Sequence, residues 1–176
     1  MALTLSDADD TPGQSKLFLS HFCMEQLSQL QSLTLIDIEF DSLNVIFSSL
    51  HHLERLEAFG YDSKTIKAYC PIWAYNYSDS INQFHSNSSK GIIEVASQLK
   101  RLRLSNYKIV PKMLLPCLRH LKVGTTTIDQ FRMVLSQTPN LHSFNISIKD
   151  DASHSEYYLL SSHLALKRLT LQIYSK

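Results

Sequence analysis

The chain has 176 residues, enough for one compact domain with a substantial buried core. Hydrophobic residues make up 44% of it and charged residues 19%, and Gly and Pro are scarce, which excludes collagen-like and disordered chains. The net charge of +1 gives no overall field that predicts a nucleic acid or a membrane surface as partner, so any electrostatic preference must come from a local patch.

The cysteines and the first residues bear on the compartment. Cys23, Cys70 and Cys117 form no CxxC pair and leave an odd thiol, which indicates a reducing compartment. Residues 1–7 have no basic region followed by an apolar run, so we see no secretory signal, and no apolar stretch approaches the roughly 18 residues of a spanning helix. We therefore expect a cytoplasmic or nuclear protein that is not secreted and does not enter a membrane.

A spaced apolar pattern recurs along the chain. Six times a leucine anchor is followed by apolar residues three and five positions later, in Leu30-Leu33-Leu35, Leu53-Leu56-Ala58, Leu99-Leu102-Leu104, Leu118-Leu121-Val123, Leu141-Phe144-Ile146 and Leu166-Leu169-Leu171. Successive anchors are 23, 46, 19, 23 and 25 residues apart, and 46 is twice 23. A fixed apolar signature of this period is typical of leucine-rich repeats. The predicted fold class is α/β, a leucine-rich repeat solenoid of about 6–8 irregular repeats, with a curved parallel β-sheet on the concave side and helices on the convex side.

In chain order, Leu3-Thr4-Leu5 is predicted to end a strand, and the polar stretch 7–15 to form a loop. A helix is expected over 16–29, with Leu19, Phe22, Cys23 and Leu27 on its apolar side. Each later repeat should contribute one strand. The expected strands lie near 32–36, 55–59, 101–105, 120–124, 143–147 and 168–173.

Helices are predicted between these strands. Leu43, Ile46, Phe47 and Leu50 have the spacing of one buried helical face. Helices near 128–137 and 154–164 should begin with capping boxes, in which a hydroxyl and a Gln or Glu side chain satisfy free backbone N–H groups. The two pairs are Thr127 with Gln130 and Ser153 with Glu156.

The domain organisation follows from the repeats. We expect a single domain over 1–176, and the abrupt start and end in mid-pattern suggest a fragment of a longer array. Residues 61–98 fit the pattern poorly. They are expected to be either a degenerate repeat, with Ile72, Tyr75 and Tyr77 in the leucine positions, or an insertion.

The junctions before three strands resemble those of a known family. Thr138-Pro139-Asn140-Leu141, Leu115-Pro116-Cys117-Leu118 and Leu99-Lys100-Arg101-Leu102 are similar to the irregular repeats of F-box proteins with leucine-rich repeats. In that family an F-box binds the Skp1 adaptor of a cullin ubiquitin ligase, and the repeats select the substrate. Residues 1–30 do not resemble an F-box. The resemblance therefore implies a substrate-recognition region, with a Skp1-type adaptor as partner only if an F-box lies outside this chain.

The side chains that flank the apolar positions should point to solvent from the concave face. They form a locally positive surface, which leads us to expect a protein partner with an acidic or phosphorylated segment. The alternative is that Lys and Arg only solvate an exposed sheet face. The expected partner-binding residues are Arg55, Glu57, Phe59, Arg101, Arg103, His120, Lys122 and Arg168.

Other chemistry has little support in the sequence. No HExxH, GxxxxGK[ST], GxGxxG or GxSxG motif occurs, so we expect no catalytic residues, no metal and no cofactor. The adjacent His51 and His52 should diverge on a helix, and Cys117 should fill a small buried position. Trp73, Tyr75, Tyr77 and Phe84 are either a partner-binding aromatic set or local packing. We expect a non-catalytic protein-binding scaffold of the F-box type; the alternative is a structural or regulatory repeat protein unrelated to ubiquitination.

Overall fold

A computed structural model of the chain describes residues 1–63, 86, 88–105, 110, 113–149 and 165–174. Its strands are β1 (Ala2–Ser6), β2 (Ser32–Ile36), β3 (Ala58–Asp62), β4 (Arg101–Leu104), β5 (His120–Thr126), β6 (Ser143–Lys149) and β7 (Arg168–Tyr174). Its helices include α1 (Gln14–His21), α2 (Phe40–Ser48), α4 (Ile128–Gln137), the 3-10 helices η1 (Met24–Leu27) and η2 (Leu50–His52), and helical residues 88–95.

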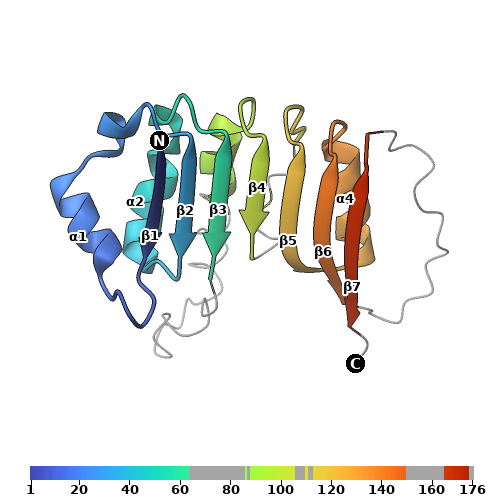
Figure 1. Cartoon of the computed structure of the whole chain (residues 1–176), viewed down its shortest axis with the longest axis horizontal. Coiled ribbons are helices and arrows are strands. Elements are labelled where there is room, and N and C mark those ends of the chain that lie inside the picture. Colours follow the sequence, from blue (N-terminus) through green and yellow to red (C-terminus); the bar gives the residue numbers. More distant parts are fainter. Residues whose placement is uncertain (64–85, 87, 106–109, 111–112, 150–164, 175–176) are drawn as a thin grey trace.

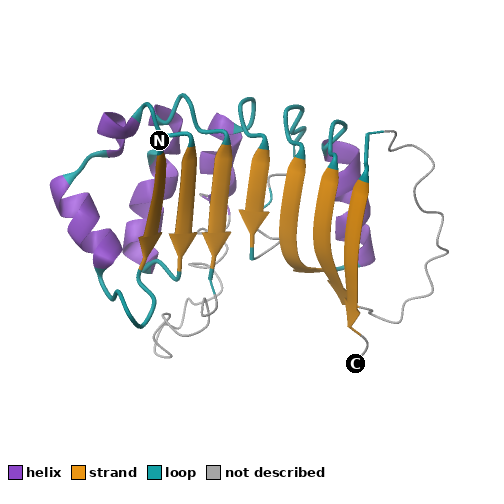
Figure 2. Ribbon diagram, in the orientation of Figure 1, coloured by secondary structure: helices purple, strands orange, loops and turns teal. Residues whose placement is uncertain are grey.

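The strands form one sheet in the order of the sequence, and every neighbouring pair is parallel. In Figure 1 the seven arrows point the same way, and α2 and α4 lie behind the sheet. Figure 2 shows the same separation of strands and helices. The predicted α/β class with a parallel sheet is therefore confirmed. Among the described residues, no helix combines the length and the apolar character needed to cross a membrane.

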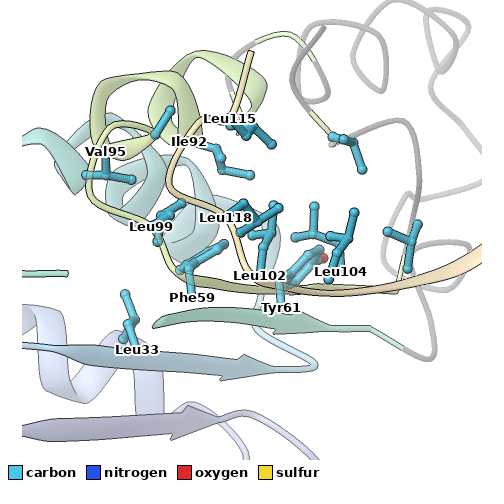
Figure 3. Packing of buried hydrophobic residues seen from close by; sticks show 14 of the residues in the cluster. Leu33, Phe59, Tyr61, Ile92, Val95, Leu99, Leu102, Leu104, Leu115 and Leu118 are labelled. Atoms are coloured by element: carbon cyan, nitrogen blue, oxygen red, sulfur yellow. The ribbon is translucent and has the colours of Figure 1, made fainter. Parts of the chain in front are cut away.

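Alternation along the strands produces the core. Leu33 and Leu35 of β2 are fully buried, while their neighbours Ser32, Thr34 and Ile36 are partly exposed. Because side chains alternate across a strand, one face of every strand packs inward. In Figure 3 the inward residues Phe59, Tyr61, Leu102 and Leu104 lie between their strands and the helix that carries Ile92 and Val95.

The anchor leucines fix where each strand begins. Leu30, Leu99, Leu118 and Leu141 have no exposed surface, and each precedes its strand by two residues. The carbonyl that follows the anchor accepts hydrogen bonds from two N–H groups of the next unit, as the Lys100 carbonyl does from Arg119 and His120. This shared contact sets the same register from strand to strand.

The strand predicted at 55–59 is wrong in position. β3 spans Ala58–Asp62, and Phe59 and Tyr61 pair in register with Leu33 and Leu35. The three apolar positions of this unit are therefore Leu56, Phe59 and Tyr61, three residues later than predicted. Because side chains alternate along a strand, a shift by an odd number of residues turns the predicted inward positions outward and the outward positions inward.

The segment between β3 and β4 adds no strand between them, because these two strands pair directly from Ala58–Arg101 to Tyr61–Leu104. The proposed repeat positions Ile72, Tyr75 and Tyr77 themselves lie outside the described residues, as does the helix predicted at 154–164.

The helices follow the prediction in part. Leu43, Ile46, Phe47 and Leu50 are buried on one side of α2 and η2, and α4 covers the predicted 128–137. The Thr127 hydroxyl accepts from the Gln130 N–H, and the Gln130 side chain accepts from the Thr127 N–H, which confirms the capping box.

Two local predictions are wrong. The helix predicted over 16–29 is two helices, α1 and η1, because Phe22 and Cys23 adopt extended backbone between them. Cys117 is exposed in the turn, and the neighbouring Leu118 is the buried residue. Leu118 is the anchor that the repeat pattern predicted, and the Cys117 thiol lies at the surface beside it.

Candidate functional site on the open sheet face

The sheet face away from α2 and α4 carries a shallow groove of about 330 Å³. We call the side chains that point outward from the strands here the open face. Its groove is lined mainly by Ser32, Thr34, Ala58, Gly60, Arg101, Arg103, His120, Lys122, Ser143 and Asn145, with edges of the core residues Phe59, Leu102 and Leu121. The lining comes from five consecutive strands, β2 to β6, so the groove runs across the strands.

Four basic side chains occupy the middle of this groove. Arg101 of β4 lies in register with His120 of β5, and Arg103 lies in register with Lys122. All four are exposed. We call these residues the basic block. Neighbouring strands are about 4.8 Å apart and alternate residues about 6.6 Å apart, so the four Cα positions form a compact rectangle.

Two ion pairs join basic residues in or just before β4 to acidic residues in or just before β3. An Arg103 guanidinium nitrogen lies 2.5 Å from the Asp62 carboxylate, and the Lys100 ammonium lies 2.6 Å from that of Glu57. Hydrogen bonding by Lys100, with the positive charges of Lys100 and Arg101, lowers the pKa of Glu57 below its usual value. Both pairs are largely exposed, so solvent screens them and their contribution to stability is small.

Arg101 and Lys122 differ from these paired cations. No hydrogen bond or ion pair joins either side chain to another of the residues that the structure describes. The Asp62 contact draws Arg103 toward β3, on the side away from Lys122. The face therefore presents two cations without an ion-pair partner among the described residues, on adjacent strands, and Arg101 acts on Glu57 only through its charge.

Short side chains flank the basic block on both sides. Ala58 and Gly60 of β3 lie in register with Arg101 and Arg103, and Ser143 and Asn145 of β6 lie in register with His120 and Lys122. A Cβ atom added at Gly60 would meet only the Thr34 side chain, at 3.5 Å. Because Gly60 has no side chain, it leaves open space in the groove, and its backbone is not strained.

The structure separates the eight predicted site residues into two groups. Arg101, Arg103, His120, Lys122 and Arg168 are exposed strand residues, as predicted, although Arg168 lies on β7, beyond β6, and does not line the groove. The other three do not lie where predicted. Arg55 is in the turn before β3, Glu57 precedes the strand, and Phe59 is a core residue with 2% exposed surface.

The three-residue shift of β3 explains both the misplaced residues and the missed ones. The outward residues of this strand are Ala58, Gly60 and Asp62, none of which was predicted. A signal for them was present, because Leu56-Phe59-Tyr61 has the same spacing as the other repeats. The overlapping triplet Leu53-Leu56-Ala58 has the same spacing and was chosen instead.

Other candidate groups do not form a site among the described residues. The rings of His51 and His52 lie 3.8 Å apart, so the prediction that they diverge is wrong, and His52 Nε2 contacts Glu25 at 2.9 Å. In this part of the chain, no group of three or more His, Cys, Asp or Glu side chains is placed to hold a metal ion. Trp73, Tyr75, Tyr77 and Phe84 lie outside the described residues.

Comparisons of the chain with protein-family models, with curated proteins and with solved structures found no match.

Proposed function

We propose that the chain is a leucine-rich repeat solenoid segment that acts without catalysis as a protein-binding scaffold. The repeat assignment is supported by the buried anchor leucines and by the sequential parallel sheet. Repeat arrays of this kind offer an extended sheet face to their partners. The open face is therefore the proposed docking surface.

The observation that carries the proposal is the basic block in the groove. Positive side chains in a groove otherwise lined by uncharged residues favour a partner of opposite charge. We propose an acidic protein segment that lies across the strands and contacts Arg101, His120 and Lys122. The alternative, that these side chains only solvate the sheet, predicts no selective binding.

Charge reversal tests this proposal. The double variant Arg101→Glu/Lys122→Glu should bind a pool of short Asp/Glu-rich peptides at least about tenfold more weakly than the unchanged chain, measured by fluorescence anisotropy. The matched control Lys16→Glu/Lys90→Glu changes the net charge equally on exposed helical residues and should bind normally. Equal binding by all three proteins would contradict the proposal.

The connection with ubiquitin ligases is a separate proposal, supported only by the resemblance of the junctions to F-box repeat proteins. It makes this chain the substrate-recognition region of an adaptor. A pull-down with Skp1 and the full-length gene product separates it from an interaction protein unrelated to ubiquitination. Absence of Skp1 from that complex would contradict the ligase proposal and leave the binding face unaffected.

A further inference from the structure

The arrangement of charge on the open face indicates what kind of acidic segment it binds. Resting on the docking function proposed above, we infer that the basic block recognises a single phosphorylated serine or threonine in an extended protein segment. A phosphoryl group carries a charge of about −1.5 to −2 and three acceptor oxygens at one point. A run of Asp and Glu instead distributes single charges along the chain.

The basic side chains that line the groove are concentrated in the same way. They lie at four register positions on β4 and β5, whereas the groove residues of β2, β3 and β6 are uncharged. A segment with carboxylates along its length would find cations only at the centre of the groove. A doubly charged group placed at the centre meets all of them.

The number of available charges also fits a dianion. Arg103 is paired with Asp62, which leaves Arg101 and Lys122 as two cations without an ion pair in the described part of the chain; Arg101 lies near Glu57, whose carboxylate is itself paired with Lys100. Arg101 has the planar fork that binds two phosphoryl oxygens at once, and Lys122 supplies a point charge from the next strand. His120, in register with Arg101, adds a ring N–H donor.

The basic block also has an energetic consequence for the empty protein. Like charges at neighbouring strand positions repel, and Arg103 and Lys122 are such a pair, although the ion pair of Arg103 with Asp62 offsets part of this repulsion. A bound dianion relieves this repulsion. A phosphorylated ligand should therefore stabilise the fold as well as bind to it.

The surroundings leave room for the rest of the segment. Ala58 and Gly60 on one side, and Ser143 and Asn145 on the other, keep the groove open along its length. The Ser143 and Asn145 side chains can hydrogen-bond to the main chain of a bound peptide. These features suit an extended segment that crosses the strands with its phosphoryl group over β4 and β5.

The test uses three pools of short peptides that differ only in a central phosphoserine, glutamate or serine. The phosphoserine pool should bind about tenfold more tightly than the glutamate pool, and inorganic phosphate should compete with it. Lys122→Gln should reduce this ratio to near one. Arg101→Lys keeps the charge but removes the fork, and should lower the ratio by a smaller factor.

A steric variant provides a check that is independent of charge. Gly60→Val fills the floor of the groove, and its Cβ makes only an ordinary contact with Thr34. Thermal unfolding first establishes that the variant folds, and it should then bind every pool more weakly. Unchanged binding by this variant would contradict the placement of the peptide in the groove.

The outcomes separate the two proposals. Equal affinity for the phosphoserine and glutamate pools would overturn the phosphoryl inference and leave the acidic docking surface standing. Absence of binding by both pools would overturn both proposals. A single-stranded oligonucleotide that binds more tightly than the phosphoserine pool would overturn the assignment of the phosphoryl group to a protein.

Discussion

Tyr61 is the largest of the fully buried side chains and belongs to the strand that the repeat pattern misplaced. Its ring meets Phe47 edge-on, with centroids 6.1 Å apart, so an aromatic residue takes the position that leucine holds on β2 and β4. Burial raises the pKa of Tyr61 to about 12. The neutral hydroxyl is therefore part of the folded core.

This raised pKa predicts a loss of stability in alkaline solution. The pKa of a tyrosine in the unfolded chain is the ordinary 10.0, and that of Tyr61 in the folded chain is about 12, so stability present below pH 10 is lost as the pH rises between the two values. The loss from this group is at most roughly 2–3 kcal/mol. Urea denaturation at several pH values should show a smaller loss for Tyr61→Phe than for the unchanged chain, and equal losses would contradict the assignment.

The residues of the site were partly predictable from spacing. Arg101, Arg103, His120 and Lys122 follow anchors that admit only one register, so their outward direction could be predicted. Phe59 could not be placed in the same way, because Leu53 and Leu56 each begin an acceptable triplet and Ala58 is apolar enough to satisfy the first. Pairing with β2 decides between the two registers, and that pairing is a property of the folded chain.

At the scale of the element, β5 contains an irregularity that depends on a glycine. The register of β5 against β6 shifts between Val123 and Thr125, and a Cβ atom on Gly124 would lie 2.0 Å from the carbonyl oxygen of Ser105. The main chain leading out of β4 therefore occupies the space of a side chain. The sequence pattern could not predict this contact, because it counts only apolar positions.

Gly124→Ala should destabilise the chain, since the backbone of the Ser105 segment must move. The expected cost is about 1–3 kcal/mol, as for other overpacked sites. Gly60→Ala is the matched control, because its Cβ meets only Thr34 at 3.5 Å and a strand usually gains from replacing glycine. Thermal unfolding checks both variants, and similar midpoints for the two would contradict the close approach at Gly124.

At the scale of the whole molecule, β7 is less protected from solvent than the strands inside the sheet. Leu102 and Leu104 of β4 are 2% and 1% exposed, whereas Leu171 and Ile173 of β7 are 40% and 68% exposed. In a stacked array each unit is stabilised by its neighbours, so a strand with a neighbour on one side only opens more readily.

Amide hydrogen exchange should follow this gradient. Amides of β3 and β4 should exchange at least about tenfold more slowly than those of β7, a difference of ~1.4 kcal/mol in the opening free energy. Mass spectrometry of peptides from the exchanged protein measures it. Uniform protection across the sheet would indicate that the strands open together as one cooperative unit.

The sequence predicted the order and direction of the strands because both depend on a periodic apolar pattern. The neighbours of a side chain across the sheet were harder to predict. Arg103 and Asp62 are 41 residues apart, and their ion pair depends on β3 and β4 being adjacent. That adjacency could not be known while a further repeat remained possible within 61–98.

The direct pairing of β3 with β4 also has a consequence for how the chain can vary. Glu57 and Lys100 are 43 residues apart, yet the Lys100 N–H donates to the Glu57 carbonyl at 2.8 Å, much as the Arg119 N–H donates to the Lys100 carbonyl at 2.9 Å across the next pair of strands. Closing a connection twice as long costs only about 0.6 kcal/mol more in chain entropy. The connection between β3 and β4 can therefore become longer or shorter in evolution with little loss of stability. An affinity tag or fluorescent reporter inserted into this connection should be accepted.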